Sequence, residues 1–344
     1  MTKMLSEIKE QPEVLRNVFA KNETVLKNLA AEIKEKGVRH AVFAARGTSD
    51  HASTYAKYLL GIYCGMSSAL AVPSAITLYG ADFDFSHDLV VGVSQSGKAA
   101  DALEVIGAGN KDGGITVAVT NDCASPMARS AKYHLDCSAG PEISVAATKT
   151  FTSEMMLLGL LTAHLSDNKQ LLEDLNSVHT AVSEVIATAF SEIEKLAARY
   201  TFIEDGFVLG RGIIYPVALE AALKIQETCY VKMKGYPNSD FYHGPIAQVD
   251  NGTFVILLAP KGKAFEDSVA MAKKIAETGA ELLVFTNDKE LAKEYRSVLL
   301  PDVSEAVAPF VFAPAIQYFA QCLSLSKGLD PDAPRMLKKV TITK

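Results

Sequence analysis

The sequence predicts an α/β protein built from two consecutive copies of one unit, each a parallel sheet covered by helices on both faces. Short apolar runs alternate with helical stretches, a pattern that predicts right-handed β-α-β units. Three motifs recur in nearly one register, which predicts the duplication. With 344 residues, 49% of them hydrophobic, the chain is long enough for two domains with a large core.

The first half of the chain contains the elements of one such unit. Residues 3–35 have the apolar spacing of one or two amphipathic helices, interrupted near Pro12. Strands are then expected at 40–45, 69–72, 89–93, 115–120 and 133–137, with helices at 50–63 and 99–105. Helices at 148–165 and 169–200 follow without a Gly or Pro linker. We therefore expect a helical junction between the two halves rather than a flexible tether.

The second half repeats the first at a shift of 165 residues for two motifs (212 − 47 and 262 − 97) and 166 for a third (288 − 122). The matched segments are 43–47 with 208–212, 97–98 with 262–263, and 119–122 with 285–288. From this repeat we predict an N-terminal helical segment at 1–38, domains at 39–166 and 201–328, a connecting helix at 167–200 and a C-terminal tail at 329–344.

One loop of the first copy has the composition of an anion site. The apolar run 89–93 ends in Ser94-Gln95-Ser96-Gly97, and a helical pattern follows. Unpaired N–H groups at a helix start, together with the helix dipole, favour a phosphate, and the serine hydroxyls would add donors. A serine N-cap before an ordinary helix is the alternative. The second copy has Ala259-Pro260-Lys261 here, which lacks the hydroxyls and one backbone donor, so only the first copy is expected to keep an anion cradle.

Composition and charge exclude several classes of function. A net charge of −6 gives no excess of positive charge with which to bind nucleic acid. The polar N-terminus and the absence of an uninterrupted apolar span of roughly 18 residues predict a cytoplasmic protein with no membrane partner. The five cysteines are odd in number and show no C-x-x-C spacing, which argues against a disulfide framework or a zinc site. Without a ligand cluster or dinucleotide fingerprint, no metal or redox cofactor is expected.

Several motifs together are similar to those of the sugar isomerase (SIS) family. They are Ala45–Ser49, Ser94–Gly97, Gly140–Lys149, Ala218–Glu227, His243–Pro245 and Pro334–Lys339. From about residue 40 onward, the chain resembles the isomerase half of glutamine:fructose-6-phosphate aminotransferases. Those enzymes also have a glutaminase domain with an N-terminal cysteine nucleophile, whereas this chain begins Met1-Thr2-Lys3 and has its first cysteine at Cys64. We therefore expect a stand-alone member, similar to SIS-type glucosamine-6-phosphate deaminases and fructosamine-6-phosphate deglycases.

The resemblance implies a site for the phosphate of a hexose 6-phosphate. Ser49, Ser94, Gln95 and Ser96 would contact the phosphate, and the lining would include Gly47, Thr48, Gly97 and Val145. Two positions depart from the family: Ala99 often is threonine there, and Ala147 replaces a serine near Val145. Neither change removes a backbone donor. The two departures therefore put the identity of the substrate in more doubt than the binding of a phosphate.

A helical stretch carries Glu220, Lys224 and Glu227 on one face, because positions i, i+4 and i+7 coincide around a helix. By spacing alone, these residues form a solvent-facing Glu–Lys pair. The functional alternative is a carboxylate that moves a proton between C1 and C2 of an open-chain sugar. The resemblance assigns that role to Glu227 and places Lys224 near the sugar hydroxyls.

Three further residues take their roles from the resemblance. His243 lies in a loop and would assist ring opening, as a histidine can act near neutral pH. In the family this loop reaches a neighbouring subunit, so we expect a homodimer with shared active sites. Glu142 would orient sugar hydroxyls. The tail lysine that forms a Schiff base with an open-chain sugar matches Lys339, with Lys338 one place away.

These observations predict an aldose/ketose isomerase that acts on an amino-sugar 6-phosphate. The first choice is a deaminase that converts glucosamine 6-phosphate to fructose 6-phosphate and ammonia. A fructosamine-6-phosphate deglycase or another phosphosugar isomerase is the alternative within the same chemistry. A non-catalytic sensor of sugar phosphates is the alternative from a different class, and it would need the serine loop but no base.

Overall fold

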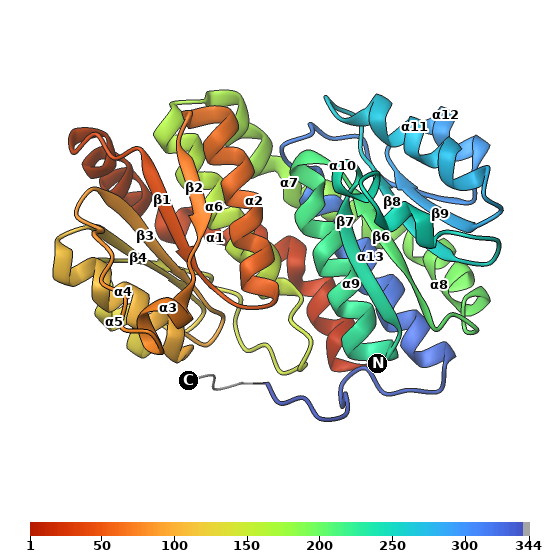
Figure 1. Ribbon diagram of the computed structural model, residues 1–344, viewed down its shortest axis with the longest axis horizontal. Coiled ribbons are helices and arrows are strands. Elements are labelled where there is room, and N and C mark those ends of the chain that lie inside the picture. The colour runs from red at the N-terminus through yellow and green to blue at the C-terminus, as the bar shows by residue number, and fades with distance from the viewer. Residues whose placement is uncertain (340–344) are drawn as a thin grey trace. The chain divides into compact units, whose positions relative to one another are not determined.

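The computed structural model describes residues 1–339 of the chain, which forms two compact units, each with its own sheet (Figure 1). Among the described residues, the sheet-A unit comprises Glu13–Glu142, Lys149–Asn176, Lys338 and Lys339. The sheet-B unit comprises Met1–Pro12, Ile143–Thr148 and Ser177–Leu337. All strand pairs in both sheets are parallel, as the alternation of strands and helices predicts.

Sheet A has the strand order β2-β1-β3-β4-β5. Its strands are β1 (His40–Ala44), β2 (Ser67–Leu70), β3 (Asp88–Val93), β4 (Ile115–Thr120) and β5 (Tyr133–Asp136). The helices of this unit are α2 (Thr48–Cys64), α3 (Pro73–Thr77), α4 (Ala100–Asp112), α5 (Pro126–Ser130) and α6 (Lys149–Ser166). Helices α4 and α5 cover one face and α2 and α6 the other (Figure 1). The core between β3 and α4 includes Val90, Val105 and Ile106, all fully buried.

Sheet B has the order β10-β9-β8-β6-β7, the same order as sheet A once corresponding strands are matched. Its strands are β6 (Asp205–Gly210), β7 (Lys232–Pro237), β8 (Phe254–Ala259), β9 (Glu281–Thr286) and β10 (Ser297–Leu299). Its helical elements are α8 (Phe190–Arg199), η1 (Gly212–Ile214), α9 (Tyr215–Cys229), α10 (Asn238–Phe241), η2 (Pro245–Gln248), α11 (Phe265–Ala276), α12 (Lys289–Glu294) and α13 (Ala308–Ser326). Helices α8, α9 and α13 lie on the face opposite α11 (Figure 1).

Two long helices differ from the sequence prediction. Helix α1 (Lys3–Glu35) is continuous through Pro12, although proline removes one helical hydrogen bond. Buried side chains on both sides of Pro12, among them Ile8 and Leu15, stabilise the helix there. The predicted connecting helix is two helices, α7 (Lys169–Thr188) and α8, which are separated at Ala189. The predicted domain boundaries stay a prediction.

Among residues 1–339, one helix, α13, is long and apolar enough to cross a membrane. However, 94% of its most apolar window is buried inside the protein. The Phe319 ring packs near those of Phe254 and Phe285 on sheet B. This burial is typical of a core helix.

Candidate active site

The predicted phosphate loops follow two neighbouring strands. Strands β1 and β3 pair in parallel, with Ala44 opposite Gly92, so the loops after them begin at the same edge of sheet A. Gly47 and Gly97 have positive φ values of 54° and 59°, which other residues rarely adopt. A Cβ atom at Gly97 would also overlap the Ser125 side chain. The local backbone therefore requires glycine at both positions.

The serine loop is open to a ligand. Within residues 1–339, the half-buried side chains of Ser94, Gln95 and Ser96 have no hydrogen-bond partner in the protein. Helix α4 begins at Ala100, and its N-cap residue Ala99 makes no side-chain capping bond. The alternative of a serine N-cap is therefore wrong. Uncapped N–H groups and unused hydroxyls suit an oxyanion such as a phosphate.

The loop after β1 is engaged more tightly with the protein. Ser49 is buried, and its hydroxyl donates a 2.9 Å hydrogen bond to Oε1 of Glu154. Ser49 must release this bond before it donates to a phosphate, because a hydroxyl has one proton to donate. Arg46 lies 2.8 Å from the carboxylate of Asp101, in the first turn of α4. This ion pair links the loop after β1 to the helix that follows the serine loop.

Replacing Ser94 and Ser96 together by alanine is expected to weaken binding of fructose 6-phosphate without unfolding the protein. Each lost charge-assisted hydrogen bond costs about 1.5–3 kcal/mol, or roughly tenfold to hundredfold in affinity. Isothermal calorimetry measures the change. Lys263→Ala, at the corresponding loop of sheet B, is the matched control and should leave the affinity unchanged. Equal affinity of the double variant and the wild type would show that the phosphate does not bind at the serine loop.

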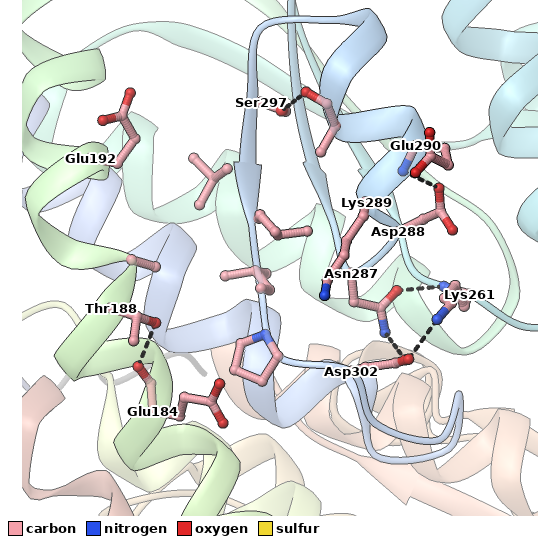
Figure 2. Close-up of a pocket in the computed structure, with 16 residues that line it drawn as sticks. Glu184, Thr188, Glu192, Lys261, Asn287, Asp288, Lys289, Glu290, Ser297 and Asp302 are labelled. Atoms are coloured by element: carbon pink, nitrogen blue, oxygen red, sulfur yellow. Dashed lines mark hydrogen bonds and ion pairs between the residues drawn. The ribbon is translucent and has the colours of Figure 1, made fainter.

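The corresponding loop after β8 is occupied by the protein's own side chains. The backbone N–H of Lys261 donates to Oδ1 of Asn287 (2.7 Å), and the N–H of Lys263 donates to the Glu305 carboxylate (2.8 Å). The Lys261 ammonium pairs with Asp302 (Figure 2). A cavity of about 1000 Å³ lies here, beside the carboxyl ends of β8, β9 and β10, and none of the predicted site residues lines it. These contacts fit the expectation that the first copy alone keeps an anion cradle.

Helix α9 holds a buried cluster of charges. The Lys224 ammonium is fully buried, 3.3 Å from Oε1 of Glu220 and 2.6 Å from Oε2 of Glu227. The Glu220 side chain is 1% exposed and that of Glu227 is 21% exposed. A solvent-facing Glu–Lys pair, favoured by spacing alone, is therefore wrong. Glu227 is the member of the cluster that reaches solvent.

The electrostatics of this cluster keep Lys224 charged. Burial lowers the pKa of Lys224, but the Coulombic attraction of Glu220, and then of Glu227, outweighs burial and raises its pKa above the usual value. One ammonium is thus shared by two carboxylates. Of these two carboxylates, only that of Glu227 is partly exposed.

Glu142 lies in the loop between β5 and α6, and its side chain is fully buried. Its carboxylate accepts hydrogen bonds from the backbone N–H of Thr150 (3.1 Å) and from the Thr150 hydroxyl (2.7 Å). Oε2 also lies 2.9 Å from Nζ of Lys339. Lys339, rather than the exposed Lys338, is therefore the tail lysine in contact with the site loop. Residues 340–344 of the predicted tail lie outside the described residues.

The segment after Glu142, residues 143–148, is part of the sheet-B unit and contains Val145. Its backbone N–H groups at Ile143 and Ser144 donate to the buried carboxylate of Glu7 on α1. The Gln317 side chain of α13 donates to the carbonyl of Thr148 (3.2 Å). These contacts hold the segment against α13 and the first part of α1, which belong to the same unit.

His243 follows α10 and is exposed. Its backbone N–H donates to the Asp240 carbonyl (3.0 Å), and Gly244 has a φ of 146°, so the loop turns sharply after the histidine. Across residues 1–339, no group of three or more His, Cys, Asp and Glu side chains is placed to hold a metal ion.

The predicted site residues divide between the two units. Sheet A carries Gly47, Thr48, Ser49, Ser94–Gly97, Glu142 and Lys339, and the sheet-B unit carries Val145, Lys224, Glu227 and His243.

Several residues of these groups are missing from the predicted site. Glu220 had a visible signal, the i, i+4 spacing to Lys224. Asp101 had a weaker one, as an acidic residue in the first turn of a helix. Nothing in the sequence marks Thr150 or Glu154, because their roles depend on contacts with residues 8 and 105 positions away.

Comparison with known proteins identifies the family. The model of the SIS domain matches residues 36–164 and 206–326. A glutamine–fructose-6-phosphate aminotransferase of Aquifex aeolicus is 34% identical over 99% of this chain, and the match spans 57% of that protein. The C-terminal domain of glucosamine-fructose-6-phosphate aminotransferase from Francisella tularensis has a TM-score of 0.86 at 27% identity, covering 97% of this chain and 98% of that one.

A glucosamine-6-phosphate deaminase from Thermotoga maritima has the same fold, with a TM-score of 0.82 at 21% identity over 99% of this chain and all of that one. The family match and the aminotransferase relative support the prediction of an enzyme. Two parallel sheets of one topology, each matched by the same domain model, place the chain in the SIS domain family.

Proposed function

We propose that the protein is an isomerase of amino-sugar 6-phosphates that releases the amine. In its main reaction, glucosamine 6-phosphate and water give fructose 6-phosphate and ammonia. The observation that carries the proposal is the buried cluster on α9, where Lys224 holds a partly exposed Glu227 carboxylate in place. A phosphate-binding module alone has no use for this arrangement, since burying charges is costly.

The residues divide the chemistry between them. The serine loop binds the 6-phosphate, and His243 assists opening of the pyranose ring. Glu227 takes the proton from C2 of the open-chain aldose and returns one to C1, while a proton of the amine passes to the C1 oxygen, which converts the C2 amine into a ketimine. The Lys339 amine then adds to C2 and ammonia leaves, which gives a Schiff base between Lys339 and the ketose. Water hydrolyses this Schiff base and releases fructose 6-phosphate.

The proposal extends to assembly and location. His243 is exposed on its loop, as a residue that completes a neighbouring subunit's site would be in one isolated chain. We therefore include a homodimer with shared active sites in the proposal, together with the cytoplasmic location expected from the sequence.

A substrate panel tests the proposed reaction. Wild-type protein should release ammonia from glucosamine 6-phosphate and form fructose 6-phosphate, and unphosphorylated glucosamine should react far more slowly because it lacks the group that the serine loop binds. Reaction with fructosamine 6-phosphates instead would establish the deglycase. Tight binding without turnover of any member of the panel would refute the enzyme and establish the sensor.

A further inference from the structure

The contact between Glu142 and Lys339 joins two residues that are 197 positions apart in the chain. The Glu142 side chain is fully buried, whereas that of Lys339 is 24% exposed. A buried carboxylate is costly unless it has a cation and hydrogen-bond donors around it. The tail lysine supplies the cation, with Nζ 2.9 Å from Oε2.

Glu142 has a second support at the start of α6. The N–H and the hydroxyl of Thr150, in the first turn of that helix, both donate to its carboxylate. The N-terminal end of a helix also favours a negative charge. Glu142 therefore stays in position when its lysine partner changes, which a carboxylate held by the lysine alone would not do.

We infer that Glu142 is the positioning and proton-transfer partner of Lys339: it holds the tail amine as a shielded ammonium and takes its proton when a sugar carbonyl arrives. The inference rests on the Schiff-base role that the proposed function gives to Lys339. It replaces the expectation that Glu142 orients sugar hydroxyls, because the carboxylate already accepts from Thr150 and Lys339.

In the formation of the Schiff base, Glu142 accepts one proton and later returns it. The Lys339 ammonium gives one proton to the carboxylate, and the neutral amine attacks the carbonyl carbon to form a carbinolamine. The protonated Glu142 then gives that proton to the departing hydroxyl, which leaves as water. The products are a protonated imine and a carboxylate, so Glu142 faces a cation before and after the reaction. The buried charge is never left without a partner.

Lys338 is an internal control, because it is the neighbouring lysine and is exposed. Brief acetylation with acetic anhydride, followed by peptide mass spectrometry, gives the labelling ratio of Lys339 to Lys338 in the full chain. In the wild type this ratio should be about tenfold below one, since an ion-paired ammonium is a poor nucleophile. In Glu142→Gln it should approach one. Comparable labelling of the two lysines in the wild type, or an unchanged ratio in the variant, would overturn the inference.

Two further variants separate positioning from simple loss of structure. Thr150→Val loosens the same end of α6 but leaves the carboxylate and the lysine, so the ratio should remain low. Glu142→Asp keeps the charge on a side chain one methylene shorter and should restore part of the protection. Circular dichroism and thermal melting establish that each variant is folded. If Glu142→Gln does not fold, a low wild-type ratio that Glu142→Asp raises severalfold supports the same conclusion.

Borohydride reduction in the presence of fructose 6-phosphate tests the chemical step. The wild type should yield a stable adduct on Lys339, and Glu142→Gln should form it about 10² to 10⁴-fold more slowly, the range expected for loss of a proton-transfer group. Lys338→Met should react as the wild type does. An equal rate in Glu142→Gln would refute the proton transfer. No adduct at all in the wild type would refute the Schiff-base role instead, while the acetylation ratio would still decide whether Glu142 holds the amine.

Discussion

Glu227→Gln is expected to lower turnover of glucosamine 6-phosphate by about 10² to 10⁴-fold while KM changes little. Glutamine keeps the size of the side chain but cannot accept a proton from carbon. Substrate binding depends mainly on the serine loop, which the substitution does not touch. Steady-state kinetics of ammonia release give both constants.

The control for this variant is Glu277→Gln, which removes an exposed carboxylate after α11 and should leave both constants unchanged. A Glu227→Gln variant with near wild-type turnover would assign the proton transfer to another group. A second comparison tests the shared site: Glu227→Gln and His243→Ala proteins, mixed and allowed to exchange subunits, should regain part of the lost activity. No recovery after proven exchange would place both residues in one subunit's site.

Lys224→Met is expected to destabilise the protein by about 3–5 kcal/mol at neutral pH, the usual cost of removing one partner from a buried ion pair. The substitution leaves the buried Glu220 carboxylate without its cation, 3.3 Å from where Nζ lies. Denaturant unfolding, monitored by circular dichroism, measures the difference in free energy. The matched control is Lys293→Met, which breaks the exposed Lys293–Glu290 pair and should cost less than about 0.5 kcal/mol.

The pH dependence of the Lys224→Met effect has a definite sign. Without the ammonium, the buried Glu220 carboxylate costs free energy only while it is charged. Acid neutralises carboxylates, so the destabilisation should be full at neutral pH and should shrink on acidification. A destabilisation that grows on acidification, or a variant as stable as the wild type at neutral pH, would contradict the buried cluster.

The central strands are predictable from the sequence, whereas the edges are less so. Strand β4 (Ile115–Thr120) has the predicted bounds because a strand buried on both faces is a continuous apolar run. The edge strand β2 (Ser67–Leu70) begins two residues before its predicted start at 69, since its alternately exposed residues form no such run. The break at Ala189 between α7 and α8 could not be predicted, because no glycine or proline lies there.

The candidate site divides in the same way. The open serine loop follows from local composition, because its hydroxyls and glycine stand directly after a strand. The burial of Lys224 does not, since it depends on the packing of α9 against α13, about ninety residues further along the chain. Glu142 and Lys339 are even further apart in the sequence, and no local pattern predicts their contact.

If a proton moves between C1 and C2 of the sugar, a deuterium label at C2 must leave that carbon during the reaction. Glucosamine 6-phosphate deuterated at C2 is incubated with the wild-type protein, and the products are analysed by mass spectrometry and NMR. We expect fructose 6-phosphate and ammonia, with the deuterium transferred to C1 or lost to solvent, since C2 becomes a carbonyl carbon. A sugar product that keeps deuterium at C2, or the absence of any reaction, would contradict this expectation.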